Sequence, residues 1–212
     1  MSGAKITSGV SISGGIKFVA SPTTTVPLGF SSSLFSISSQ TLQNVWEQHT
    51  IDISSYASAT VRVVFWYLRG TSFTGDIQID DIYINGTTYT FESGVQNFIR
   101  NSAALNVGTL VTTYPSSMTT TALTTTSSIA FWNRDAGGTP SGATSSTIDH
   151  TLGTTAGFYV YAETSGGSTG SPYFLATPSI TLSGSPGNMT FWTSRYGATI
   201  GTLQVYVYVE SV

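Results

Sequence analysis

Apolar and polar residues alternate with a period of two along much of this chain, and this pattern restricts it to β-structure more than any other feature. Side chains of a strand point alternately to its two faces, so each alternating run predicts a strand. The run VRVVFWYLRG is apolar on both faces, which is typical of a central strand. The three clearest runs are residues 61–70, 76–84 and 202–210, and further strands are predicted at 10–19, 89–92, 157–163, 172–176 and 188–194.

Composition agrees with an all-β sandwich and excludes several other classes. The separators between runs are clusters of Gly, Pro, Ser and Thr, and residues 95–105 are the only helix candidate. Charged residues make up 8% of the 212 residues, too few for the surfaces of a helical bundle. The seven basic residues are scattered from Lys5 to Arg195, which argues against a nucleic-acid partner. No apolar run approaches the roughly 20 residues of a membrane span.

The absence of cysteine excludes disulfides, thiol catalysis and zinc–thiolate sites together. The first residues show neither a basic nor an apolar signal region, so we expect synthesis in the cytosol. Charges this few suggest that neighbouring molecules cover much of the surface.

Asn85-Gly86 is the strongest local signal, because it separates two alternating runs. Both central residues of a type I′ hairpin turn need positive φ, and Asn-Gly satisfies that need well. Asn85-Gly86-Thr87 and Asn188-Met189-Thr190 also match the glycosylation sequon, and at the first of them the turn is the favoured interpretation.

Two stretches resemble the MAM domain, an adhesion module of cell-surface receptors and meprin-type proteases. VWEQHTIDISSY (45–56) and the runs up to residue 84 resemble the C-terminal half of that family. FES (91–93) resembles its opening Phe-Glu, and Thr-Pro-Ser, Asp-His-Thr, Glu-Thr-Ser and Phe-Trp elements then follow in the order of its N-terminal half. The resemblance implies an antiparallel, jelly-roll-like β-sandwich of the concanavalin-like two-sheet kind.

The two halves stand in exchanged order, and the paired cysteines of extracellular MAM domains are missing. We expect one domain over residues 1–212, with an N-terminal arm or strand at 1–25. Residues 26–87 would supply the C-terminal half of the family, and 88–212 the N-terminal half with a Thr-rich insertion at 100–128. A circular permutant, a fragment of tandem repeats, and halves exchanged between chains all explain this order. Permutation is favoured, because neighbouring termini tolerate it and the Asn85-Gly86 turn can join them.

A structural cation is the main site prediction. If Ile77 and Ile79 face the core, alternation places Asp81 beside them, where a carboxylate must be paired or bound to a metal. The resemblance implies a Ca²⁺-like ion held by backbone carbonyls and by some of four acids: Asp81, Glu92, Asp80 and Asp149. Ordinary buried carboxylates, bonded to backbone amides or arginine, are the alternative.

No catalytic residue is predicted. Asp149-His150-Thr151 invites a hydrolase interpretation, but the chain has no Gly-x-Ser-x-Gly elbow and no HExxH motif. The resemblance makes His150 a packing residue, and His49 is expected to be exposed. Aromatic residues could form a sugar platform, but their apolar surroundings favour core packing for Trp46, Trp66, Trp132, Trp192 and Tyr206. Tyr206 and Tyr208 lie on the less apolar face of their strand and are the candidates for partner binding.

These features predict a non-enzymatic structural or adhesion module. A cysteine-free, charge-poor sandwich fits a phage or virus particle protein, such as a capsid decoration, tail or fibre component that binds other subunits or itself. The Thr-rich stretch 109–128 is either a surface loop or an arm that reaches a neighbour. The alternative is an extracellular module that binds glycans or a host surface.

Overall fold

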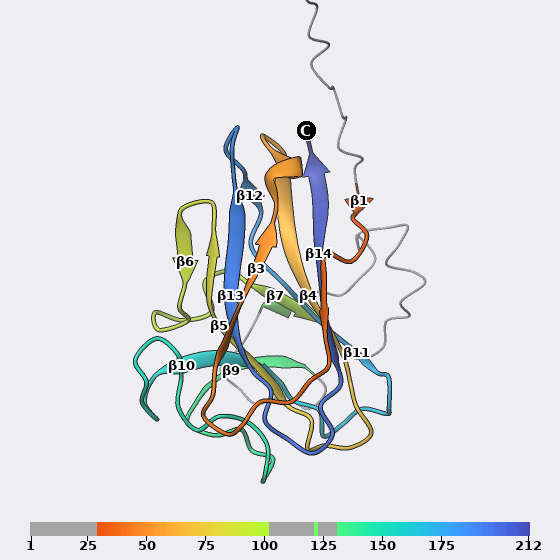
Figure 1. Cartoon of the computed structure of the whole chain (residues 1–212), viewed down its shortest axis with the longest axis vertical. Coiled ribbons are helices and arrows are strands. Elements are labelled where there is room, and N and C mark those ends of the chain that lie inside the picture. Colours follow the sequence, from red (N-terminus) through yellow and green to blue (C-terminus); the bar gives the residue numbers. More distant parts are fainter. Residues whose placement is uncertain (1–28, 102–120, 123–130) are drawn as a thin grey trace, which may run out of the picture.

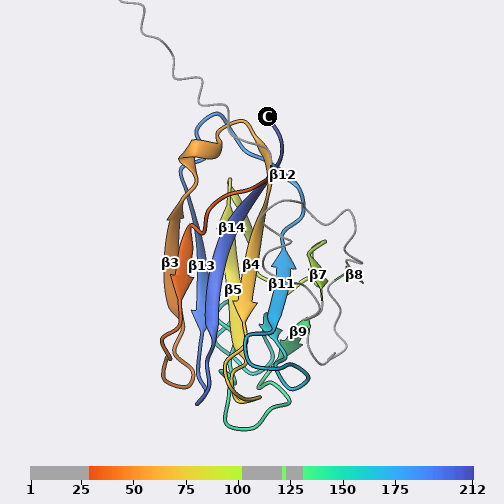
Figure 2. The same cartoon turned by 90° about the vertical axis from the view of Figure 1, so that its right-hand side faces the viewer.

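The computed structural model describes residues 29–101, 121–122 and 131–212, which form two packed antiparallel β-sheets (Figures 1 and 2). Sheet A contains β1 (Gly29–Phe30), β2 (Phe35–Ile37), β4 (Thr60–Leu68), β7 (Ile99–Asn101), β8 (Thr121–Ala122), β11 (Pro172–Ala176), β12 (Ile180–Thr181) and β14 (Thr202–Ser211). Sheet B contains β3 (Glu47–Asp52), β5 (Ile77–Ile84), β6 (Thr87–Tyr89), β9 (Trp132–Ala136), β10 (Phe158–Ala162) and β13 (Asn188–Ser194). The predicted all-β sandwich is confirmed.

The strand order interleaves the two halves of the chain. Sheet A runs β1-β14-β4-β11-β7-β8, with β2 also on β14 and β12 on β4, and sheet B runs β3-β13-β5-β10-β9, with β6 on β5. Strand β14 pairs with β4 over nearly its whole length, and β13 lies between β3 and β5. The halves therefore complete one sandwich within a single chain. Gly29 pairs with Val209, so the first described strand lies beside the last.

The core lies between the sheets, where the inward residues of every long strand meet. Strand β4 contributes Val61, Val63, Phe65 and Tyr67, and β14 contributes alternate residues from Leu203 to Val209. All of these side chains are almost completely buried. Burial of this much apolar surface is the main source of stability for such a sandwich. Among the described residues the only helix is the short 3₁₀ turn Ser54–Tyr56, and no helix there is long and apolar enough to span a membrane.

A β-bulge in β5 overturns the prediction that Asp81 faces the core. Trp192 of β13 pairs with Asp80, whereas Thr190 pairs with Tyr83, so β5 carries one extra residue. Asp81 adopts a φ of 44° at this point. The extra residue reverses the alternation. Before the bulge Ile77 and Ile79 face the core, and after it Ile82 and Ile84 do. Asp81, at the bulge, therefore faces outward.

The outer face of sheet B is covered along part of β5 by the segment between β9 and β10. Gln78 donates to the backbone oxygen of Ser146 (2.9 Å) and accepts from its N–H (2.5 Å). Thr139 donates to Asp76 (2.7 Å). Alternation correctly placed Asp76, Gln78 and Asp80 opposite the core, but all three are fully buried beneath this segment.

Most predicted strands coincide with observed ones. Stretches 172–176 and 188–194 are β11 and β13, and 157–163 contains β10. The strand expected at 89–92 is wrong, because β6 ends at Tyr89 and Phe91 has a φ of 60°. The helix candidate at 95–105 is also wrong over its described part, which contains strand β7. The strand predicted at 10–19 and the Thr-rich arm lie outside the described residues, apart from β8.

Candidate functional site

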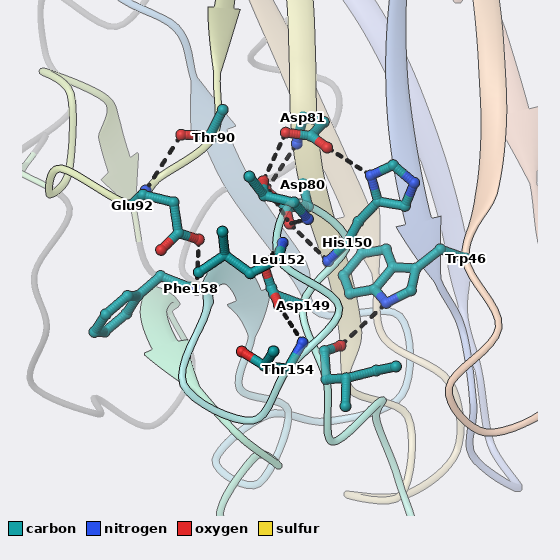
Figure 3. A network of polar contacts seen from close by, with 12 residues as sticks. Trp46, Asp80, Asp81, Thr90, Glu92, Asp149, His150, Leu152, Thr154 and Phe158 are labelled. Carbon is teal, nitrogen blue, oxygen red and sulfur yellow. Dashed lines mark hydrogen bonds and ion pairs between the residues drawn. The ribbon is translucent and has the colours of Figure 1, made fainter.

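A cluster of charged and aromatic side chains occupies the outer face of sheet B, where the turn 149–152 crosses the bulge of β5 (Figure 3). Asp80 lies at its base and is fully buried. Its carboxylate accepts the N–H groups of His150 (2.9 Å) and Thr151 (3.2 Å), and also that of Asp81 (2.8 Å). Burial, and secondarily the charge of Asp81, raise the pKa of Asp80 to about 8. Asp80 therefore fixes the backbone that presents His150.

Asp81 holds the imidazole of His150. The ring donates Nδ1–H to Asp81 Oδ2 at 2.5 Å, and the hydroxyl of Thr151 donates to the other oxygen of Asp81 at 2.7 Å. Both members of the pair remain partly accessible, with 27% of the His150 side chain and 18% of the Asp81 side chain exposed. When Nδ1 donates, the neutral imidazole keeps Nε2 as a hydrogen-bond acceptor.

Two indole rings complete the cluster. The His150 ring stacks on Trp192 with 3.8 Å between centroids and 19° between planes, and Trp46 meets His150 edge-on at 6.2 Å. Trp46 donates its N–H to the backbone oxygen of Ile148 (3.1 Å). The predicted core packing is confirmed for Trp132 but wrong for Trp46 and Trp192, which are half-buried on the outer side. Trp66 is buried but points away from the core between the sheets.

The four acids predicted as metal ligands do not converge on one point. The two carboxylate oxygens of Asp149 accept the N–H groups of Leu152 (2.6 Å) and Thr154 (2.9 Å), and Glu92 accepts that of Phe158 (2.8 Å). Among the described residues, no three His, Asp or Glu side chains gather into a metal-binding group. The calcium site therefore rests on the resemblance alone, and the observed contacts match the alternative of carboxylates bonded to backbone amides.

A second pair of buried acids lies where β5 begins and β10 ends. Asp76 accepts the N–H and the hydroxyl of Thr164, each at 2.9 Å, and Glu163 accepts the N–H of Ser165 at 3.0 Å. Burial, followed by repulsion from Glu163, raises the pKa of Asp76 to about 6. These acids lie beneath the 137–146 segment, where they hold loops together.

His49 is not the exposed residue that was expected. It is half-buried, with its ring 4.8 Å from that of Phe35 and 5.3 Å from that of Phe191. Burial and the neighbouring charge of Arg195 lower its pKa. Arg195 is fully buried and forms an ion pair with Glu47, so this group joins β3 to the end of β13.

Tyr206 and Tyr208 lie on the outer face of sheet A, as their alternation predicted. Each is half-buried rather than exposed, and both pack against an apolar group formed by Val64, Trp66, Phe174 and Ala176. Their role in partner binding remains a prediction.

The geometry of the His150 cluster favours binding over catalysis. In an acyl-transfer triad the nucleophile donates to the imidazole that will accept its proton. Here the hydroxyl of Thr151, the residue next to His150, donates to Asp81 at 2.7 Å rather than to the imidazole. What the cluster offers is a rigid imidazole between indole rings at a partly open surface.

The fold belongs to the class of antiparallel two-sheet β-sandwiches. Within it, residues 121–212 match the family model of the MAM domain, meprin/A5/mu. That family consists of extracellular adhesion modules rather than enzymes. The match covers somewhat less than half of the chain, and it falls within the segment predicted to correspond to the N-terminal half of the family. Among solved structures, none matches the chain.

The sequence pointed to Asp80, Asp81 and His150, but it did not predict that His150 contacts two indole rings. It also did not predict that Tyr83 faces outward. One signal was present: Ile79 and Ile82 are three residues apart where alternation requires two. That interruption at Asp80-Asp81 marks the bulge that turns Asp81 and Tyr83 outward.

Proposed function

We propose that this protein is a non-enzymatic adhesion and assembly module that works on the surface of a virus or phage particle. Its MAM-like C-terminal part supports an adhesion role. The particle setting is supported by composition, because a cysteine-free sandwich needs no oxidising compartment to fold. A secreted module that binds host surfaces is the alternative setting.

The observation that best supports assembly is the shortage of available positive charge on the described surface. Every arginine in the described residues is engaged internally: Arg69, Arg100, Arg134 and Arg195 are buried, and Arg62 forms an ion pair with Glu210 at 2.6 Å. The two lysines lie outside the described residues. A surface without available cations cannot attract anionic partners by charge, so apolar contact and hydrogen bonds are the interactions it offers such partners.

Exposed apolar side chains on this cation-poor surface provide contact area. Leu42 is 77% exposed, Leu152 56% and Phe73 49%, and all three lie in loops. Loops that rigid sheets hold in place are common positions for binding residues. A module displayed in many copies also gains avidity from weak individual contacts.

Sedimentation velocity over a concentration series tests this function. We expect the full-length protein to form oligomers or larger assemblies as its concentration rises into the range of 100 µM, roughly where weak interfaces associate. A protein that stays monomeric throughout and joins no particle would overturn the assembly function.

A further inference from the structure

The geometry points to a carbohydrate-binding face on sheet B, centred on His150, Trp192 and Tyr83 and specific for neutral sugars. This inference goes beyond the assembly function and does not depend on it. A sugar ring needs directional hydrogen-bond partners for its hydroxyl groups and an apolar surface for its C–H face. Both are present here within one part of one sheet.

The directional partner is Nε2 of His150. Because Asp80 fixes the backbone at His150 and Asp81 takes the Nδ1–H, the tautomer protonated at Nδ1 holds Nε2 in a fixed place as an acceptor. Fixing a side chain before binding reduces the entropy lost on association.

The aromatic and hydroxyl groups follow the strand register. Tyr83, 41% exposed, pairs with Thr190 of β13, and Thr190 pairs in turn with Thr50 of β3. Trp192 lies two residues after Thr190 on β13, and it pairs with Gln48, which is exposed. Because residues two apart share a strand face, these side chains lie on the outer side of sheet B, the side on which His150 stacks on Trp192. The bulge at Asp81 is what turns Tyr83 to this side.

Charge selects the class of sugar. The carboxylate of Asp81 is already occupied by His150 and Thr151, and Asp81 repels an anionic ligand. None of the five described arginines offers a free cation to this face, since each is buried or paired elsewhere. Sialylated or sulfated sugars therefore gain no ion pair here, whereas neutral sugars match the imidazole, hydroxyl and amide groups.

NMR titration of the full-length protein tests the site directly, because the chain contains only two histidines. The probes are maltohexaose, cellohexaose, mannopentaose and galactobiose, with 3′-sialyllactose as the anionic comparison. We expect at least one neutral probe to shift the His150 imidazole resonances, leave those of His49 unchanged, and bind more tightly than the sialylated probe.

Three variants locate the binding. His150→Phe keeps a ring to stack on Trp192 but removes Nε2, and Tyr83→Ala removes an exposed ring without opening the core. Each is expected to weaken binding roughly tenfold, the effect of losing one such contact. Val212→Ala shortens an exposed apolar side chain just beyond the end of β14 in sheet A, outside this face, and is expected to leave affinity unchanged.

Some results would overturn the carbohydrate site without touching the assembly function. These are no binding of any neutral probe at millimolar concentration, or binding that His150→Phe and Tyr83→Ala leave intact. Preference for the sialylated probe would overturn the neutral specificity. If the wild-type protein binds a neutral sugar but does not self-associate in the sedimentation experiment, the assembly function is rejected and the carbohydrate site is not.

Discussion

At the scale of single residues, this protein buries several charges and satisfies each with backbone or hydroxyl donors. Asp76, Asp80 and Asp149 are the clearest examples: Asp76 and Asp80 bind backbone N–H groups of segments that pack on sheet B, and Asp149 binds those of its own turn. The sequence offered buried carboxylates as the alternative to a metal site for Asp80 and Asp149, and it placed Asp76 only on the face of its strand opposite the core. It could not predict their partners, since backbone N–H groups from distant loops leave no mark in the residue pattern.

Replacement of Asp76 should change how stability depends on pH. Its pKa of about 6 in the folded protein lies above the ordinary value of 3.8, so the folded state retains a proton that the unfolded chain releases. The stabilisation is therefore fully present below about pH 4 and is lost as the pH rises through 6. Urea unfolding from pH 4 to 7 should show the wild-type protein losing roughly 2–3 kcal/mol that Asp76→Asn does not lose.

The control for this prediction is Asp52→Asn. Asp52 is exposed, and hydrogen bonds with Ser54 lower its pKa, so its replacement should leave the fall between pH 4 and 6 in place. Identical pH profiles for wild type and Asp76→Asn would show that Asp76 is ionised in the folded protein.

At the scale of elements, strands followed from alternation wherever the alternation was uninterrupted. β4, β11, β13 and β14 were predicted with nearly their observed bounds. β2, β8 and β12 have two or three residues each, too few for a period to be recognised. The bulge in β5 had a visible signal in Asp80-Asp81, but a fixed period of two projected Asp81 to the wrong face.

The Asn85-Gly86 turn gives a direct test at this scale. Asn85 and Gly86 have φ values of 50° and 85°, as the type I′ prediction requires, and no atom lies within 4 Å of a side chain added at Gly86. Gly86→Ala should therefore lower the free energy of unfolding by roughly 1 kcal/mol through backbone strain alone. Gly142→Ala, at an open position without positive φ, should cost much less, and equal effects in thermal unfolding would refute this explanation.

At the scale of the whole molecule, the two halves of the chain interleave, so the exchanged order that the resemblance predicts is compatible with one sandwich. Strands β14 and β4 pair along nearly their whole length, and β1 lies beside the end of β14. The sequence left three explanations open, because the exchanged order is the same in all of them. A sandwich closed within one chain, with its ends adjacent, favours permutation.

A re-permuted chain tests that explanation. A short Gly/Ser linker would join Val212 to Gly29, and new termini would open between Asn85 and Gly86. Since Gly29 and Val209 are already paired, we expect the same β-rich circular dichroism spectrum and one cooperative thermal transition. A chain that remains unfolded or aggregates would indicate that the present order is required for folding.

Association through apolar contact is the central claim about function, and its dependence on salt is the most direct measurement. Light scattering would follow the mass of the protein at protein concentrations from about 1 µM to about 100 µM, in 50 mM and in 1 M NaCl. The Debye length is roughly 14 Å in the first salt and roughly 3 Å in the second. The account predicts masses above the 22.3 kDa monomer that are nearly the same in both salts. A monomer at every concentration, or assemblies that dissociate in 1 M NaCl, would contradict it.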